Sequence, residues 1–437
     1  MRRLILEQLS KWKQKEKRKP LLIYGARQVG KSWIMDEFGR TNFKDFVHLN
    51  FERNERICSL FENSLDPKVI LRGLEIETRR KISADTLIIF DEIQACPRAI
   101  TSLKYFCEDF PKYHVIGAGS LLGVALHQGL SFPVGKVDAL HMYPMTFREF
   151  LEALGEDQLC ETLDAREIDL IRVFRDKLIE YLKTYFYVGG MPEVVASYAK
   201  EKDFQKVRQL QKRILSDYKS DFSHHIPKEI LDKANKLWES IPVQLAKENK
   251  KFVYKEIDAK TSRSKDYDPA IQWLKDSGLI YQVHRIKKPA LPISGYAEEN
   301  IFKLFMLDVG LLSAKTSLDV RVLLEGSKIF TEFKGAMTEQ FVLQELSAKE
   351  DIEIGYWTNK NGDAEVDFVA QIGSKIVPIE VKAGENLRAR SLAFYNEKYS
   401  PEICVRTSLA DYKQTENLYD VPLYMVGNLC YQEYMIP

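Results

Sequence analysis

A glycine-containing loop between two regular elements is the feature that most constrains how this chain can fold. Residues 21–35 read LLIYGARQVGKSWIM, which is an apolar strand-like run, a loop of the form G-x-x-x-x-G-K-S, and a helix-like stretch. Glycines let the backbone approach an anion closely, and amide groups at a helix start can cradle phosphates. The pattern predicts an α/β fold with a phosphate-binding loop formed by Gly25, Ala26, Arg27, Gln28, Val29, Gly30, Lys31 and Ser32.

Two residues at the end of this loop have predicted chemical roles. Lys31 is expected to supply a positive charge to the terminal phosphates of ATP, and Ser32 to act as a ligand of Mg²⁺. The alternative is a chance glycine-rich turn. The strand before the loop and the helix after it provide the context that the motif requires, so we predict ATP and Mg²⁺ as cofactors.

Two acids follow a second apolar run, in the segment TLIIFDEIQACP. A buried parallel strand reads as a continuous apolar run, and acids at its carboxyl end point into the ligand crevice of an α/β sheet. We expect Asp91 to hold Mg²⁺ through water, and Glu92 to orient and deprotonate the attacking water. Alone, the two acids could simply cap a strand in solvent. Ser120, at the end of the strand-like HVIGAGS, is a predicted sensor of the terminal phosphate.

Charge and cysteine content narrow the class of protein. The 437 residues, which suggest two to four domains, include 64 Lys and Arg against 63 Asp and Glu, so any nucleic-acid site must be a local basic patch. The six cysteines form no C-x-x-C pair, which favours free thiols in a reducing compartment. We see neither a signal peptide nor an apolar run of roughly 20 residues, and predict a cytoplasmic protein without a membrane partner.

The end of the chain carries a second group of charged residues. Residues 334–349 read as a helix, and IEIGYW, AEVDFVAQ and KIVPIEVKA read as three strands. Alternation along the last strand puts Glu380 and Lys382 on one face, and a hairpin could bring Asp367 beside them. This D…E-x-K arrangement is typical of restriction-endonuclease-like folds, where two acids bind a divalent metal and the lysine assists the attacking hydroxide. Glu339 matches the additional acid of such folds.

The D…E-x-K spacing alone is weak, because polar residues often alternate with apolar ones along half-buried strands. The surrounding apolar residues strengthen it, since buried acids are costly unless a metal or a partner holds them. Two interpretations remain open. One is an active nuclease with a second divalent metal at Asp367, Glu380 and Glu339; the other is an inert fold whose acids pair with Lys382 and other basic residues.

The middle of the chain, residues 231–325, has the order of a winged helix. Pro269 fits the first turn of a helix, Gly278 stops it, and LIYQVHRI begins the wing. A winged helix can contact DNA or serve as a protein-interaction or lid element. The helix carries acids beside its lysines, which makes DNA contact the less favoured of the two.

The loop at residues 25–32, FDEIQ, YPMTFREF and GGMPEVV, in this order, resemble a group of AAA-type P-loop ATPases of bacteria and archaea. The C-terminal part of that group is usually labelled uncharacterised. The resemblance covers nearly the whole chain, and implies a winged helix and a nuclease-like C-terminal fold. Members often have an arginine shortly before the YP segment, where this chain has Lys136. An arginine finger at this position is in doubt, because lysine lacks the planar fork that suits a phosphoryl transition state. Arg148 is the nearest arginine, and we interpret it as an ion-pair partner or a solvated residue.

We therefore predict four regions: an AAA-type core at 1–185, a helical lid or linker at 186–230, the winged-helix region at 231–325 and a restriction-endonuclease-like domain at 326–437. The leading hypothesis is ATP-dependent action on DNA through a nuclease-like domain. The alternative is a nucleotide-gated switch or scaffold that binds a protein partner. A homo-oligomer is compatible with either.

Overall fold

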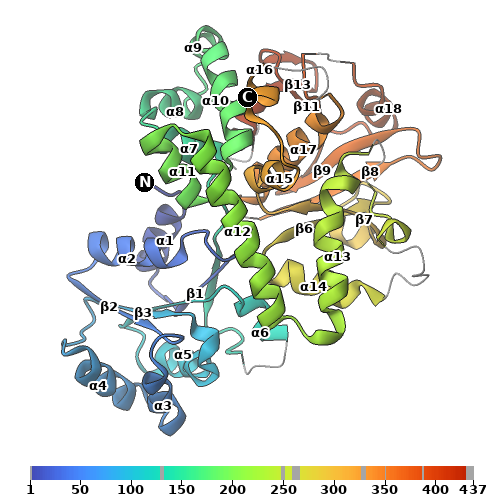
Figure 1. Ribbon diagram of the computed structural model, residues 1–437. Helices are drawn as coiled ribbons and strands as arrows, with labels where there is room; N and C mark the ends of the chain where they lie inside the picture. The colour runs from blue at the N-terminus through green and yellow to red at the C-terminus, as the bar shows by residue number, and fades with distance from the viewer. Residues whose placement is uncertain are drawn as a thin grey trace. The chain divides into compact units, whose positions relative to one another are not determined.

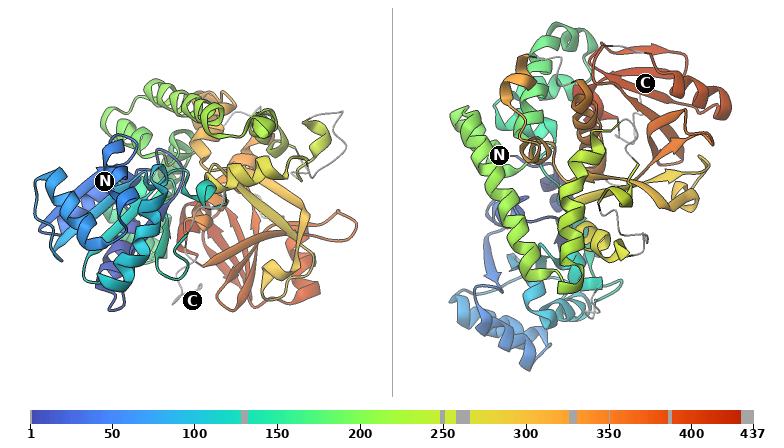
Figure 2. Two further views of the ribbon diagram at one scale, coloured as in Figure 1. Left: turned by 90° about the horizontal axis from the view of Figure 1, so that it is seen from below. Right: turned by 45° about the vertical axis from the view of Figure 1, so that its right-hand side comes forward.

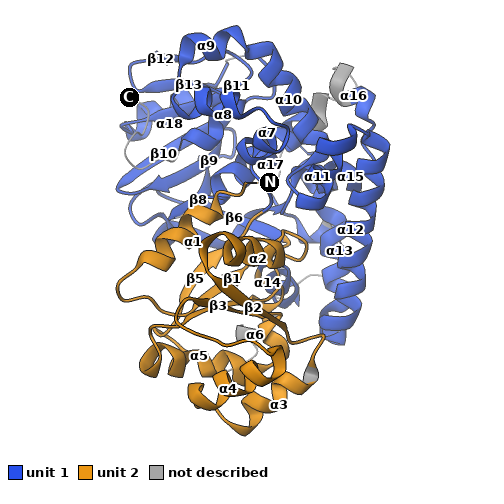
Figure 3. Ribbon diagram, turned by 90° about the vertical axis from the view of Figure 1, so that its left-hand side faces the viewer, with its two compact units in different colours: residues 1, 144–275, 280–437 blue, residues 2–143, 276–279 orange. Residues whose placement is uncertain are grey.

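The computed structural model describes residues 2–127, 132–247, 251–257, 266–325, 331–349, 351–385 and 388–429. Two compact units are distinguished, coloured in Figure 3. Unit 2 comprises Arg2–Tyr143 and the short segment Asp276–Leu279, and unit 1 comprises Pro144–Lys275 and Ile280–Pro437. Each unit is described by itself. The described cysteines, at positions 58, 96, 107, 160 and 404, are free thiols, as predicted, and Cys430 lies outside the described residues.

Unit 2 is built on a five-stranded parallel sheet in the order β2-β3-β4-β1-β5. Its core strand β3 is buried along its whole length, as its continuous apolar run predicts. The predicted α/β core with a parallel sheet is therefore confirmed. The strands are β1 (Leu21–Tyr24), β2 (Asp45–Asn50), β3 (Thr86–Asp91), β4 (His114–Ala118) and β5 (Asp138–His141).

Helices cover the faces of this sheet (Figure 1). One apolar core joins alternate residues of the strands, such as Ile88 and Phe90, to the helices that follow β2 and β3. The first helix buries Ile5, Leu9 and Trp12, which recur at helical spacing. The helices are α1 (Ile5–Gln14), α2 (Lys31–Asn42), α3 (Glu55–Asn63), α4 (Pro67–Thr78), α5 (Pro97–Asp109) and α6 (Leu122–His127), with the 3₁₀ turn η1 (Ile93–Ala95).

Unit 1 begins with a run of helices. Helix α7 starts with a capping box, in which the Thr146 side chain and Glu149 satisfy each other's backbone amides. The helices before the second sheet are α7 (Phe147–Ala153), α8 (Asp157–Asp164), α9 (Ile168–Val173), α10 (Arg175–Val188), α11 (Pro192–Glu201), α12 (Phe204–His225), α13 (Lys228–Leu245), the turn η2 (Tyr254–Glu256) and α14 (Asp268–Asp276).

The second sheet has eight strands in the order β12-β13-β11-β10-β9-β8-β6-β7. Figure 2 shows α17 and α18 beside it, and α18 packs on it through Leu392 and Tyr395. The strands are β6 (Ile280–Ile286), β7 (Ala297–Met306), β8 (Ile352–Thr358), β9 (Glu365–Ile372), β10 (Lys375–Val381), β11 (Cys404–Ser408), β12 (Lys413–Thr415) and β13 (Leu418–Pro422). The remaining elements are η4 (Ile293–Tyr296), α15 (Val309–Lys315), α16 (Val320–Glu325), α17 (Thr331–Ser347), α18 (Arg390–Tyr399) and η6 (Leu423–Asn428).

The strands predicted for the wing join the C-terminal sheet. β6 and β7 form an antiparallel pair, and β6 continues the sheet through a parallel pairing with β8. A winged helix is therefore not confirmed, and residues 258–265 of the predicted region lie outside the described residues. The four domain boundaries stay predictions. The C-terminal element order α17-β8-β9-β10-α18-β11 agrees with the predicted helix followed by three strands.

Candidate functional site

The loop after β1 has the backbone geometry that its glycines predict. Gly25 has φ +139°, and a Cβ atom placed on it would lie 2.2 Å from the carbonyl oxygen of Met142. Gly30, at φ 95°, precedes the first residue of α2. Both positions lie in the region of backbone space that L-residues rarely adopt. Any side chain at either glycine would therefore displace the loop from the start of α2.

Lys31 is folded back onto the loop. Its ammonium donates to the carbonyl oxygens of Gly25 and Ala26, each at 2.8 Å, and its side chain is buried. Burial lowers the pKa of Lys31 to about 8, while the charges of Glu92 and Asp91 act in the opposite direction. An anion in the loop offers the ammonium stronger partners than two carbonyl groups do.

Ser32 and Asp91 meet at the carboxyl edge of the sheet. The Ser32 hydroxyl donates to Asp91 Oδ2 at 2.7 Å, and the Asp91 carboxylate is almost completely buried. Burial acts to raise the pKa of Asp91, but hydrogen bonds from His48 and Ser32 outweigh it and hold this pKa below its usual value. A hydroxyl and an ionised carboxylate side by side are hard oxygen ligands, so this pair fits Mg²⁺.

Glu92 and Ser120, the predicted base and the predicted phosphate sensor, also lie side by side. Glu92 Oε2 accepts from the Ser120 hydroxyl at 3.1 Å and from the Gln94 side-chain amide at 2.7 Å. Glu92 has φ 49°, an uncommon conformation for a residue other than glycine. Arg27, from the phosphate loop, donates through Nε to the Ser120 hydroxyl at 3.1 Å. A chain of polar contacts thus connects the loop to the predicted base.

Sequence reasoning missed several residues of this site. His48 Nε2 lies 3.3 Å from Asp91 Oδ2, and its Nδ1 lies 2.6 Å from Asp36 Oδ1. His48 lies near the end of β2, and this strand pairs with β3 so that Asn50 is in register with Asp91. The position of His48 close to the end of a predicted strand was the one signal in the sequence that could have indicated it. Arg3 donates to the carbonyl oxygen of Val29 at 3.0 Å, a long-range contact with no local sequence signal.

A segment distant in sequence also contacts the loop. An ideal Cβ on Gly278 would lie 3.0 Å from the backbone nitrogen of Ala26, and Gly278 has φ +72°. From the sequence, Gly278 is expected only to end a helix. In the structure it also allows the chain to pass close to the phosphate loop within unit 2.

The two candidates for an arginine finger have other partners. Lys136 Nζ lies 2.8 Å from Glu108 Oε1, near the end of α5 and just before β5 begins. Because the strands are parallel, this is the amino edge of the sheet, opposite the phosphate loop at the carboxyl edge. Arg148 is held by Asp164 and Glu152, at 2.7 and 2.9 Å, as an ion-pair partner.

The residues PMTF and GGMP, which carry much of the resemblance, form a buried junction within unit 1. The amide of Met145 donates to Gly190 O at 2.6 Å, and Gly190 in turn donates to Asp308 Oδ2 at 2.6 Å. A Cβ atom on Gly189 would lie 2.3 Å from Asp308 Oδ1. Both segments therefore pack around the buried carboxylate of Asp308.

Glu345 is a second buried carboxylate of this junction and makes the stability of unit 1 depend on pH. It accepts from the Phe147 amide at 2.8 Å, and burial raises its pKa to about 7, with the Glu149 charge adding to the effect. Because the folded-state pKa exceeds the unfolded value, stability should fall as pH rises from about 4.5 to 7. Glu345→Gln should therefore stabilise the protein at pH 8, by on the order of 2 kcal/mol, and change little at pH 5.

Thermal unfolding of the variant and the parent at pH 5 and pH 8 checks this prediction. The exposed Glu397 on α18 provides a matched control, because Glu397→Gln should change neither midpoint. An equal effect of Glu345→Gln at both pH values would contradict the expected linkage.

The C-terminal acids also lie together, through the predicted hairpin. β9 and β10 pair antiparallel, and the amide of Val381 donates to Asp367 Oδ2 at 2.8 Å. Lys382 Nζ lies 2.6 Å from Glu380 Oε1, and Glu339 Oε2 lies 3.8 Å from the ammonium of Lys303 on β7. In the described ranges, no three His, Cys, Asp or Glu side chains are grouped so as to hold a metal ion. A second metal site is therefore not confirmed.

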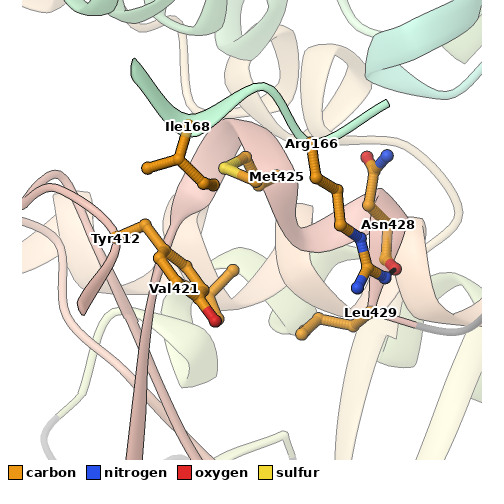
Figure 4. A pocket seen from close by; sticks show the side chains of 7 residues that line it. All are labelled: Arg166, Ile168, Tyr412, Val421, Met425, Asn428 and Leu429. Carbon is orange, nitrogen blue, oxygen red and sulfur yellow. Dashed lines mark hydrogen bonds between the residues drawn. The ribbon is translucent and has the colours of Figure 1, made fainter. Parts of the chain in front are cut away.

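A pocket in unit 1 is lined by none of these predicted residues (Figure 4). It is partly open to solvent, has a volume of about 90 Å³ and is lined mainly by apolar groups, and the Arg166 guanidinium in its lining donates to Asn428 O at 2.9 Å. Nothing in its lining was singled out from the sequence. The lining residues are Arg166, Ile168, Tyr412, Val421, Met425, Asn428 and Leu429.

Comparison with protein families gives three matches. Residues 17–151 match a family described as an AAA domain. Residues 179–321 and 334–426 match two families described as domains of unknown function, DUF8612 and DUF4143. The first match, together with the loop and sheet of unit 2, supports a P-loop ATPase of the AAA type. Proteins of this type generally use ATP and Mg²⁺. A search of curated proteins gives no match.

Solved structures with detectable similarity are distant. A Walker-type ATPase of Pyrococcus abyssi is 13% identical, with 71% of this chain and 94% of that chain covered and a TM-score of 0.45. The ORC1 protein of Aeropyrum pernix in complex with DNA is 14% identical, with 72% and 90% covered and a TM-score of 0.27. Similarity at these scores carries no argument about function. Separately, none of the helices within the described residues has the length and apolar character needed to cross a bilayer.

Proposed function

We propose that unit 2 binds ATP with Mg²⁺ and hydrolyses it. The observation that carries this proposal is the convergence of Lys31, Ser32, Asp91, Glu92 and Ser120 at the carboxyl edge of one parallel sheet. Ligands of α/β sheets bind at this edge, and a helix that starts there presents amide groups to an anion. At this edge, the phosphate loop and the two carboxylates of Asp91 and Glu92 therefore meet.

Each residue has a role that follows from its contacts. Lys31 exchanges the carbonyl oxygens of Gly25 and Ala26 for phosphate oxygens of ATP. Ser32 and Asp91 would hold Mg²⁺, which when bound neutralises charge on the phosphates. Glu92 leaves Ser120 and Gln94 to accept a proton from the attacking water. Ser120 is then able to donate its hydroxyl to the terminal phosphate.

Arg27 is the cation best placed to act where an arginine finger acts in related enzymes. Its Nε donates to the Ser120 hydroxyl. Its positive charge also acts to lower the pKa of the neighbouring Lys31, and this effect is smaller than the effects of burial, Glu92 and Asp91. Lys136 lies at the opposite edge of the sheet with Glu108. We therefore assign the stabilisation of transition-state charge to Arg27, within the same chain.

The test of this function is release of phosphate from ATP by the purified chain, with Mg²⁺ and with EDTA. Hydrolysis is expected only with Mg²⁺, and Asp91→Asn should lose it. Absence of hydrolysis with and without DNA, together with no ATP binding by calorimetry, would overturn the proposal.

For the C-terminal sheet, we propose the role of a nucleotide-gated switch or scaffold for a protein partner. The supporting observations are the direct ion pair of Glu380 with Lys382 at 2.6 Å and the hydrogen bond that the Val381 amide donates to Asp367 Oδ2. The nuclease hypothesis requires the same residues to take a metal and activate water. The element order α17-β8-β9-β10-α18-β11 is compatible with a nuclease-like fold in either case.

DNA cleavage distinguishes the two roles. The purified chain, incubated with circular and linear DNA, ATP and Mg²⁺ or Mn²⁺, is expected to cut neither substrate. Cleavage that Asp367→Ala abolishes would establish the nuclease and refute the scaffold. DNA binding without cleavage, measured over a range of salt, would point instead to a local basic patch, with a log–log slope of about −0.9 for each phosphate contacted.

A further inference from the structure

We propose that the ammonium group of Lys303 is the permanent cation of the acid cluster in the C-terminal sheet, where a metal-dependent nuclease would hold a divalent metal ion. The cluster consists of the carboxylates of Glu339, Glu365, Asp367 and Glu380. The proposal deepens the scaffold role proposed above, because it gives a physical reason for an inert site. It concerns a lysine that the sequence analysis did not single out.

Lys303 enters the cluster from a neighbouring part of the sheet. It lies on β7, its side chain is fully buried, and its Nζ is 2.6 Å from Glu365 Oε1 and 3.8 Å from Glu339 Oε2. The ammonium also lies 4.8 Å from the ring centroid of Tyr356 on β8, a cation–π contact. Acids from α17 and β9 and a ring from β8 thus surround one cation.

The acids that Lys303 contacts offset the cost of burying its charge. Glu365 Oε1 at 2.6 Å and Glu339 Oε2 at 3.8 Å provide the paired carboxylates that a buried ammonium needs. A second ammonium, that of Lys382, pairs with Glu380 Oε1 at 2.6 Å. The cluster therefore already contains two cations supplied by the chain.

A divalent ion does not fit beside these two ammonium groups. Mg²⁺ or Mn²⁺ needs several oxygen ligands at about 2.0–2.6 Å, and would lie next to a buried positive charge that cannot leave for solvent. Among the four acids of this cluster, Glu380 Oε2 is the one buried carboxylate oxygen that has neither a hydrogen-bond partner nor another interaction within the described residues. One such oxygen is too few for a metal site. The donor set therefore fits a lysine and does not fit a divalent metal.

The position of Lys303 explains why the sequence did not reveal this arrangement. The D…E-x-K pattern lies within residues 367–382, whereas Lys303 is more than sixty positions earlier, in IFKLFM. That run predicts a buried strand, in which a lysine would be unusual. β7 reaches the cluster only because β6 and β7 extend the C-terminal sheet beyond β8.

The experiment replaces Lys303 by methionine and looks for rescue by a metal ion. Lys303→Met leaves the carboxylates without their cation, so the melting temperature in EDTA should fall by roughly 5–10 °C. Mn²⁺ should then recover at least half of this loss by binding to the carboxylates that have lost the Lys303 ammonium. The full-length chain is measured without nucleotide and in an Asp91→Asn background, so that the ATP site contributes no metal binding.

Lys315→Met is the matched control. Lys315 is a half-buried lysine, paired with a single acid, Glu239, at 2.7 Å and lying 5.3 Å from the ring of Trp238. Its replacement should destabilise the protein without rescue by Mn²⁺, because one carboxylate is too few for a metal site. Rescue of Lys303→Met alone supports the proposal, and a folded Lys303→Met variant without rescue overturns it.

A titration of the parent chain provides a test that does not depend on the folding of Lys303→Met. In the same Asp91→Asn background, no Mn²⁺ should bind to the C-terminal sheet. One Mn²⁺ bound per chain and lost on Asp367→Asn would overturn the proposal. If Mn²⁺ binds in this way but DNA is not cleaved, the Lys303 proposal fails while the scaffold role remains. If DNA is also cleaved, the scaffold role fails as well, so the two outcomes can be distinguished.

Discussion

Replacement of Lys31 by alanine is expected to weaken ATP binding by about 10- to 100-fold. In the structure the ammonium is buried and bonded to two loop carbonyl groups, so it is already oriented toward the position of the phosphates. A hydrogen bond to a charged group contributes about 1.5–3 kcal/mol, which corresponds to this loss of affinity. Isothermal titration calorimetry with ATP and Mg²⁺ measures the effect directly.

Lys44→Ala is the control for this variant. Lys44 belongs to the same unit but is exposed, where it pairs with Asp85 at 2.7 Å. Its removal should leave ATP affinity unchanged. An equal affinity of Lys31→Ala and the parent chain would contradict the assignment of residues 25–32 as the phosphate loop.

Glu92→Gln should slow ATP hydrolysis by about 10²- to 10⁴-fold while ATP affinity changes little. A glutamine can still accept from Ser120 and occupy the same space, but it cannot take the proton of the attacking water. The loss should therefore appear in kcat and not in the binding constant. Single-turnover hydrolysis, together with calorimetric binding of ATP, separates these two quantities.

Glu108→Gln serves as the control for Glu92→Gln. Glu108 pairs with Lys136 at the amino edge of the same sheet, so its replacement should leave hydrolysis by a single chain unchanged. Hydrolysis at the parent rate in Glu92→Gln would exclude this residue as the base. A large loss in Glu108→Gln would instead implicate Lys136, acting from a second copy of the chain.

Much of the nucleotide site could be predicted because its parts are local in sequence. The loop at residues 25–32 contains its own glycines, lysine and serine, and Asp91 and Glu92 end an apolar run that can only be a buried strand. In a parallel sheet the carboxyl ends of strands share one edge, which brings distant segments together without further information. The convergence of Ser32 with Asp91, and of Ser120 with Glu92, follows from this rule.

The partners that sequence reasoning missed are set by register and by long-range packing. His48 reaches Asp91 because β2 pairs with β3, so that Asn50 lies opposite Asp91. Arg3, near the start of the chain, and Gly278, more than 270 residues later, both lie against the phosphate loop. Periodicity in a sequence relates residues within one helix or strand. These three residues reach the site through contacts between different elements, so no periodicity relates them to it.

By itself, the sequence determined the chemistry that each local segment can perform: a phosphate loop, a strand that ends in two acids, and a hairpin with Asp367 and Glu380. The tertiary structure decided which charges meet. It places Lys382 on Glu380, and Lys303 beside Glu365 and Glu339, because β6 and β7 join a sheet whose remaining strands begin only at Ile352. The cost of burying a carboxylate depends on the nearest cation, and that neighbour is a property of the fold.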